Sequence, residues 1–171
     1  MNETLKLIDQ LIAEHKVMNE RAMNIEKAAN DASLLTDLKE ARETFVPGRF
    51  DQRQSLGKLE EMLVAIGSWL DKHFNREETI LLSAVEKHGE RKLISALNSL
   101  LLEHTDIRNR IGESKEHIAE LTGGGLGRHR WDASANDMRA HLTHTRRLLE
   151  AHAAMENGLF AELRRALAGD R

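Results

Sequence analysis

The sequence predicts an all-α fold, namely an antiparallel up-down four-helix bundle with an extra segment crossing between helices one and two. The first observation is composition, because the 171 residues include one proline and no tyrosine and are rich in good helix formers. The second is that four long stretches carry apolar residues at helical spacing. The third is that proline or glycine separates these stretches. The length suits one core, so we expect a single domain over residues 1–171.

The first expected helix runs from Glu3 to about Asn30. Its apolar residues form one buried stripe, made of Leu5, Ile8, Leu11, Ile12, Met18, Ala22 and Ile25. The next stretch, from Asp31 to Gly57, is mixed: it contains a candidate short helix, and the single proline within residues 45–48 predicts a turn. We interpret this stretch as the segment that crosses the bundle.

The second expected helix is long and runs from about Gln52 to His88, where Gly89 ends it. Its inner side is predicted to carry Leu59, Met62, Leu63, Ile66, Trp69, Leu70, Phe74, Ile80 and Leu81. One continuous inner stripe over this length favours a single helix that spans the bundle.

The third expected helix begins near Leu93 and ends at the glycine-rich run 123–127. That run lacks the Lys-Ser/Thr of a phosphate-binding loop, so we interpret it as a linker. The fourth helix is expected from about Ser134 to Leu167, with an apolar pattern formed by Met138, Leu142, Leu148, Leu149, Met155, Phe160 and Leu163. Four such helices favour an antiparallel bundle.

Charge and cysteine content exclude several classes of function. The 28 acidic and 25 basic residues give a net charge of -3, which provides no attraction to nucleic acid or to a membrane surface. The absence of cysteine excludes thiolate-bound zinc, iron–sulfur clusters and disulfides, so any metal must be bound by nitrogen and oxygen. The N-terminal residues resemble neither a signal peptide nor a membrane span, and we therefore expect a cytoplasmic protein. The sequence does not indicate an oligomeric state.

Two of the expected helices contain a histidine followed four residues later by a glutamate. These pairs are His73 with Glu77 and His152 with Glu156, and such spacing places both side chains on one face of a helix. Acidic residues are abundant in the chain, so the spacing alone is weak support for a metal site.

An internal repeat strengthens the case. When His15 is laid over His104, residues 11–15 match residues 100–104, and each half becomes a helix with Glu-His followed by a helix with His-x-x-x-Glu. Two helical hairpins related by a pseudo-twofold axis would bring these groups to one level of the core. The expected metal ligands are His15, His73, Glu77, His104, His152 and Glu156.

These six residues lie on the apolar stripes, and burying six ionisable groups without a compensating cation is very costly. Imidazole and carboxylate ligands suit iron, manganese or zinc. Two carboxylates placed to bridge favour two ions, and we expect two irons. The pattern is not the Glu-x-x-His of ferritin-like bundles, and six ligands exceed the four that a single zinc takes.

The order of these motifs on four successive helices resembles the hemerythrin-like, or HHE cation-binding, family over most of the chain from His15 to Glu156. The resemblance implies a non-heme di-iron site in which Glu77 and Glu156 bridge the irons beside an oxo or hydroxo bridge. It assigns His15 and His73 to one iron and His104 and His152 to the other. It also implies a small diatomic or peroxide ligand (O2, NO or H2O2).

The chain departs from the oxygen-carrying hemerythrins at two points. Arg108 occupies the position of their second histidine in helix three, and the spacing from His152 to Glu156 is shorter than theirs. We therefore expect a sensor, scavenger or iron-handling protein rather than an oxygen carrier. Two alternatives remain: a redox enzyme acting on nitric oxide or peroxide, or in iron-centre repair, and a helical interaction module that metal only stabilises.

Other polar residues are given smaller roles. We expect His141 and His144 to be hydrogen-bonded within the fold or half-exposed, and Arg108 to pair with a surface carboxylate. Glu14 and Glu103 fit either of two roles: hydrogen-bond acceptors behind the metal-binding rings, or solvated surface residues. The remaining histidines are expected in solvent, at His88, His117 and His129.

Overall fold

The structure is a computed structural model that describes residues 2–43, 54–123 and 125–169, and these described residues form helices with no strand among them. The prediction of an all-α fold is confirmed. The helices are, in order, α1 (Asn2–Ala29), α2 (Ala32–Glu43), α3 (Gln54–Asn75), the π-helix η2 (Arg76–Leu81), α4 (Leu82–His88), α5 (Arg91–Thr122) and α6 (Arg128–Ala168).

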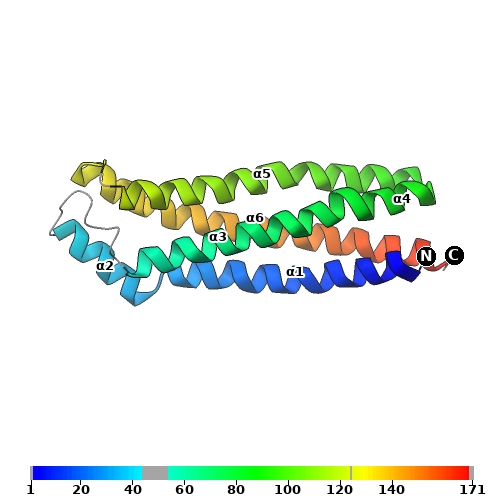
Figure 1. Cartoon of the computed structure of the whole chain (residues 1–171), viewed down its shortest axis with the longest axis horizontal. Coiled ribbons are helices and arrows are strands. Elements are labelled where there is room, and N and C mark those ends of the chain that lie inside the picture. The colour runs from blue at the N-terminus through cyan, green and yellow to red at the C-terminus, as the bar shows by residue number, and fades with distance from the viewer. Residues whose placement is uncertain (1, 44–53, 124, 170–171) are drawn as a thin grey trace.

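The long helices lie side by side along one axis, with both chain termini at one end and α2 at the other (Figure 1). Contacts join α1 to α6, α6 to α5, α5 to α3, and α3 back to α1. The helices therefore close into a ring around a shared core. Among the described residues, no helix combines the length and the apolar composition needed to cross a lipid bilayer.

The helix α2 is the described part of the expected crossing segment. It packs against α1, α3 and α6 and buries Leu34 in the core. The proline turn expected at residues 45–48 lies outside the described residues.

The second expected helix is divided into α3, η2 and α4, which follow one another without a break. A π-helix accommodates more residues per turn than an α-helix, so the residues after it face in a new direction. Ile80, expected on the inner side, lies within η2, where the wider turn departs from the α-helical spacing used to predict it; it is 56% exposed, whereas Leu81 and Val85 are buried. Gly89 ends α4 as expected, with a left-handed backbone at φ 81°.

The last helix begins at Arg128, six residues before the expected Ser134. Trp131 explains the difference, because its ring is buried and its Nε1 donates a hydrogen bond of 3.1 Å to the carbonyl of Leu121. Around it the first turn of α6 is polar and exposed, which concealed the helix in the sequence. Met155, included in the apolar pattern of α6, is 57% exposed.

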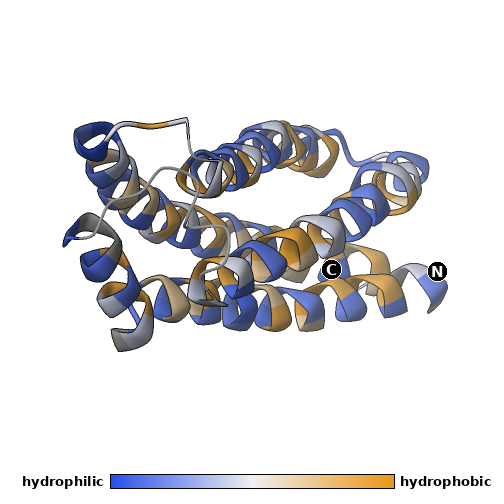
Figure 2. Cartoon of the chain, turned by 60° about the vertical axis from the view of Figure 1, so that its left-hand side comes forward, coloured by the Kyte–Doolittle hydropathy of each residue, from blue (hydrophilic) through white to orange (hydrophobic). Residues whose placement is uncertain are grey.

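Hydrophobic and hydrophilic residues alternate around each helix (Figure 2), and the buried apolar side chains are spread along the length of the bundle. They form two clusters, one containing Met18, Phe74 and Ile107 and the other containing Leu11 and Leu100. On α1 and α5 the boundary between the clusters falls between Leu11 and Met18 and between Leu100 and Ile107. A layer of buried polar groups occupies this boundary.

Candidate metal centre

The polar layer is formed by the six residues expected to bind metal. The histidines come from four different helices, with His15 on α1, His73 on α3, His104 on α5 and His152 on α6. The carboxylates come from the π-helix η2 and from α6. All six side chains are 2% exposed or less: His15, His73, Glu77, His104, His152 and Glu156. The structure therefore brings the expected residues into one buried cluster.

Glu77 lies between the two pairs of histidines. Its Oε1 is 3.1 Å from Nε2 of His73 and 3.6 Å from Nε2 of His15. Its Oε2 is 3.1 Å from Nε2 of His104. Each oxygen of this carboxylate thus faces a different pair.

Glu156 has the corresponding arrangement from the opposite side. Its Oε2 is 2.9 Å from Nε2 of His15, and its Oε1 is 3.2 Å from Nε2 of His104 and 2.5 Å from Nε2 of His152. Two sets of ligand atoms are close enough to hold a metal ion, one formed by His15, His73, Glu77 and Glu156 and the other by His104, His152 and Glu156.

The hydrogen bonding of the cluster supports a bound cation. Several of its inward-facing atoms are buried and, although the imidazoles and carboxylates lie within ion-pair distance of one another, form no hydrogen bond of good geometry in the described part of the chain: Nε2 of His15, His73 and His152, both oxygens of Glu77, and Oε2 of Glu156. Leaving a buried polar atom unpaired costs about 1–3 kcal/mol. These atoms are the nitrogen and oxygen donors that iron, manganese and zinc accept, so a cation at the centre would satisfy them.

The outward nitrogens of two rings are bound by glutamates from neighbouring helices. Nδ1 of His73 donates to Oε2 of Glu14 at 2.5 Å, and Nδ1 of His152 donates to Oε2 of Glu103 at 2.5 Å. The sequence left two roles open for these glutamates, and the structure supports that of acceptors. Each one serves the ring of another helix, because neighbours along one helix point about 100° apart.

The acceptors of the other two rings were not anticipated from the sequence. Nδ1 of His104 donates to Oε1 of Glu78 at 2.9 Å, and Nδ1 of His15 donates to Oδ1 of Asn157 at 2.6 Å. Both acceptors directly follow the central glutamates in the repeat, a signal that the sequence contained. With Nδ1 held by an acceptor on every ring, Nε2 is the nitrogen that faces the centre and is left to bind a metal.

The electrostatics of the cluster point in the same direction. Burial disfavours the charged form of His15, but the nearby Glu156 and Glu77 outweigh it and raise its pKa to about 10. Burial likewise opposes protonation of His104, yet the same carboxylates raise its pKa to about 9. Burial also acts against the ionised form of Glu156, but the surrounding histidines lower its pKa. In metal-free protein, protons therefore supply the positive charge that the carboxylates require.

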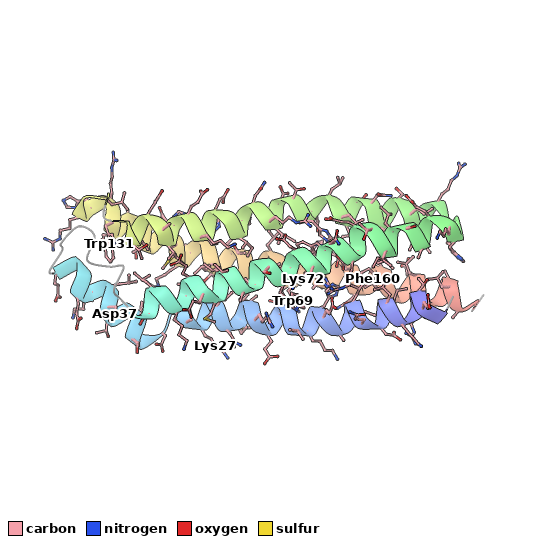
Figure 3. The ribbon with its side chains drawn as sticks, in the orientation of Figure 1. Lys27, Asp37, Trp69, Lys72, Trp131 and Phe160 are labelled. Atoms are coloured by element: carbon pink, nitrogen blue, oxygen red, sulfur yellow. The ribbon has the colours of Figure 1, made fainter. Side chains whose placement is uncertain are left out.

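Aromatic side chains line the cluster. Trp69 and Phe160 are labelled in Figure 3. The ring of Trp69 lies parallel to His73 with centroids 5.3 Å apart, and Phe160 stacks on His15 at 5.6 Å. Phe74 stacks on His104 at 3.8 Å. These apolar faces restrict the access of water to the rings.

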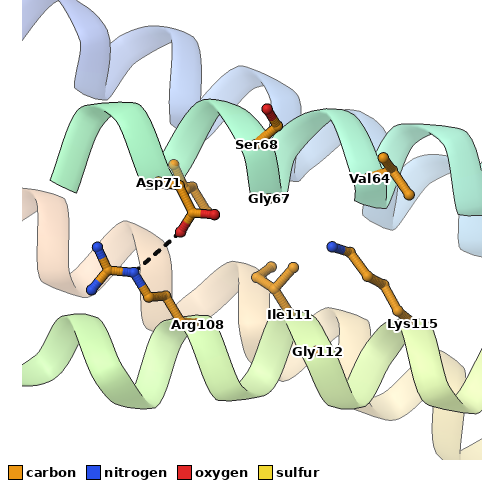
Figure 4. Close-up of a pocket in the computed structure, with 9 residues that line it drawn as sticks. Val64, Gly67, Ser68, Asp71, Arg108, Ile111, Gly112 and Lys115 are labelled. Carbon is orange, nitrogen blue, oxygen red and sulfur yellow. Dashed lines mark hydrogen bonds and ion pairs between the residues drawn. The ribbon is translucent and has the colours of Figure 1, made fainter. Parts of the chain in front are cut away.

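A groove of about 450 Å³ lies beside the cluster, between α3 and α5 (Figure 4). Arg108 stands at its wall, where Nε donates to Asp71 at 3.2 Å and Nη1 donates to Glu78 at 2.9 Å. The expectation that Arg108 pairs with a carboxylate is confirmed. Through Glu78, Arg108 is connected to the ring of His104.

The remaining histidines lie away from the cluster. His141 is half-buried and its Nε2 donates to the carbonyl of Arg110 at 3.0 Å, while His88, His129 and His144 are exposed. His117 is half-buried rather than solvated and lies 5.4 Å from His141, ring to ring. Within the described ranges, no third group of histidines and carboxylates lies close enough to hold a metal ion.

A helical bundle with buried histidines and glutamates that present unpaired ligand atoms defines a class of metal-binding helical proteins. Comparison with family models agrees: the hemerythrin HHE cation-binding domain matches residues 6–164. The chain belongs to this family. Neither the curated proteins nor the solved structures gave a match.

Proposed function

We propose that this chain is a non-heme di-iron protein that binds a small diatomic molecule or a peroxide. The observation that supports it is the placement of Glu77 and Glu156, each with one oxygen toward each pair of histidines. In this proposal the whole chain is one hemerythrin-like domain. Its four antiparallel rods are α1, the run α3–η2–α4, α5 and α6, and α2 is the additional crossing segment.

In this proposal each iron takes two histidines, and the two glutamates are shared between them. His15 and His73 would bind one iron, His104 and His152 the other, and both glutamates would bridge the two. Two carboxylates between two pairs of imidazoles suit ions about 3.5–4 Å apart. Manganese is the closest alternative, whereas zinc favours four ligands around a single ion.

Iron bound by these residues would supply a redox-active Lewis acid. The chain's own residues hold the rings in place through their Nδ1 hydrogen bonds and exclude water with Trp69, Phe74 and Phe160. Arg108 is bound to Glu78, so it adds no ligand where oxygen carriers have histidine. This favours sensing or scavenging of nitric oxide or peroxide, or iron handling, over oxygen transport.

Metal analysis of protein purified without added metal tests the proposal. We expect about two irons per chain and near-ultraviolet charge-transfer absorption, and we expect both to be lost in His73→Ala and in Glu156→Ala. His144→Ala is the matched control, because it removes an exposed histidine of α6 and should retain both irons. Wild-type protein without iron, or unchanged iron content in both site variants, would contradict the proposal.

Ligand binding is tested next on the iron-loaded protein. Nitric oxide, oxygen and hydrogen peroxide are added separately while the absorption spectrum is recorded. A change that saturates near one equivalent per site indicates binding, whereas consumption over many equivalents in the presence of a reductant indicates an enzyme. If metal raises the melting temperature but no ligand alters the spectrum, the metal serves only to stabilise the bundle.

A further inference from the structure

The two halves of the cluster differ in the residues behind their histidines, although the sequence repeat would make them alike. Laying His73 over His152 places Glu78 over Asn157. Glu78 is a carboxylate 2.9 Å from Nδ1 of His104, whereas Asn157 is a neutral amide 2.6 Å from Nδ1 of His15. One half thus has an anionic acceptor where the other has a neutral one.

A second difference concerns Glu14 and Glu103, which occupy matching positions in the two halves. Arg76 donates from Nη2 to Oε1 of Glu14 at 2.6 Å and offsets its charge. The same superposition places Met155 over Arg76, and a thioether cannot pair with Glu103. Among the described residues, no lysine or arginine forms an ion pair with Glu103, which is 42% exposed.

Both differences make one half more negative. Behind His15 and His73 lie the carboxylate of Glu14, the guanidinium of Arg76 and a neutral amide, so the formal charge there is zero. Behind His104 and His152 lie two carboxylates and one guanidinium, which leaves one negative charge. The carboxylates and the amide contact the histidine rings directly, and each guanidinium contacts one of the carboxylates.

We propose that these outer residues make the two metal positions unequal, such that the position at His104 and His152 favours the higher oxidation state. A carboxylate that accepts the Nδ1 proton makes Nε2 of the same ring a stronger donor. Excess negative charge also stabilises the more positive ion. Glu78 and Glu103 are positioning residues, because they would act on the metal only through the rings of His104 and His152. The inference rests on the di-iron function proposed above.

Spectroelectrochemical titration of the iron-loaded protein tests the inference, with each step being the loss of one electron from one iron to the electrode. Glu78→Gln and Met155→Arg should both move the lower-potential step to higher potential. Met155→Arg supplies the missing guanidinium at an exposed position, so it should not disturb the fold. Arg76→Met should move the upper step to lower potential, so the two steps approach each other from either side.

Met23→Arg is the matched control for added charge, because Met23 is 39% exposed and lies eight residues, about 12 Å, along α1 from His15. It should leave both steps in place. Unmoved steps in variants that retain two irons would overturn the inference alone, as would Glu78→Gln and Met155→Arg acting on the upper step. If Glu78→Gln loses iron, the potentials of Met155→Arg and Arg76→Met decide whether the inference holds. A wild-type chain that binds no iron overturns the di-iron function as well.

Discussion

The ring of Phe74 lies flat against the ring of His104, with centroids 3.8 Å apart and planes inclined by 13°. The guanidinium carbon of Arg108 lies 5.2 Å from the centroid of the same phenyl ring. Phe74 is fully buried and also meets His152 edge-on at 6.1 Å. One aromatic side chain therefore supports both histidines of one half of the cluster.

Replacing Phe74 with alanine should lower the free energy of unfolding of the metal-free protein by about 3–5 kcal/mol, because it empties a site in the packed core. Urea unfolding followed by circular dichroism measures this change. Leu102→Ala is the control, since Leu102 is 78% exposed and its loss should change stability by no more than about 0.5 kcal/mol. Equal effects of the two substitutions would show that Phe74 does not pack as described.

The metal-free protein should be most stable in weakly acidic solution. Folding raises the pKa of His15 from 6.5 to about 10 and that of His104 from 6.5 to about 9. Their contribution is complete below pH 6.5 and is lost as the pH rises through 9 and 10. Folding lowers the pKa of Glu156 from 4.5, so its contribution is present above that pH and is lost in stronger acid.

Urea midpoints of metal-free protein at several pH values test this prediction. Stability should be higher near pH 6 than near pH 10. The metal-loaded protein is the control, because rings that bind a metal hold no proton at Nε2 and should not show this alkaline loss. A metal-free protein as stable at pH 10 as at pH 6 would contradict the assigned pKa directions.

Metal uptake should release protons for the same reason. At pH 7 both His15 and His104 are protonated in the metal-free protein, since each pKa lies well above that pH. Binding through Nε2 displaces those protons, so at least about two should leave per chain. Calorimetric titration of metal-free protein with zinc, in two buffers of different ionisation enthalpy, gives the number released. Uptake without proton release would mean that the rings are neutral before binding.

The sequence predicted the helical class of the fold and the six residues that the structure clusters, because both depend on periodicity along one chain. The burial of His15 and His104 followed from the apolar residues around them. Whether these residues bind metal remains a prediction. The repeat carried more information than either His-x-x-x-Glu spacing, since it related helices that meet only in the folded bundle.

Features that depend on contacts between helices were harder to predict from the sequence. The π-helix from Arg76 to Leu81 has no clear signal in composition, and it reversed the predicted position of Ile80. The early start of α6 depends on Trp131 packing against the end of α5, which a polar turn of sequence does not reveal. Glu78 and Asn157 occupy matching positions in the repeat, directly after Glu77 and Glu156, but their role as acceptors depends on which ring each one meets across the bundle.

Two glycines on opposite walls of the groove allow a test of local packing. A Cβ at Gly67 would lie 3.1 Å from Nζ of Lys115, the mobile end of a flexible side chain, whereas a Cβ at Gly112 would meet nothing within 4 Å. Alanine at either helical position should raise the free energy of unfolding by about 0.5–1 kcal/mol. Thermal and urea unfolding measure the change.

Gly89→Ala is the contrasting variant, because the backbone at Gly89 has φ 81° and a side chain there costs about 1–2 kcal/mol. The two helical substitutions should therefore raise the free energy of unfolding, and Gly89→Ala should lower it. Destabilisation by Gly67→Ala alongside stabilisation by Gly112→Ala would show that the side chain of Lys115 does not move aside for the added methyl group.

The two tryptophans should report iron binding unequally. Trp69 lies parallel to a ligand ring, 5.3 Å from His73, whereas Trp131 lies near the opposite end of the bundle from the N-terminus (Figure 3). Trp131 precedes His152 by 21 residues on α6, or about 32 Å along the helix. A redox-active ion quenches a nearby indole far more than a distant one. Iron should therefore strongly quench the fluorescence of Trp131→Phe, which retains Trp69, and barely affect Trp69→Phe. Zinc, which is not redox-active, should quench neither variant, and equal quenching of both by iron would place the metal elsewhere.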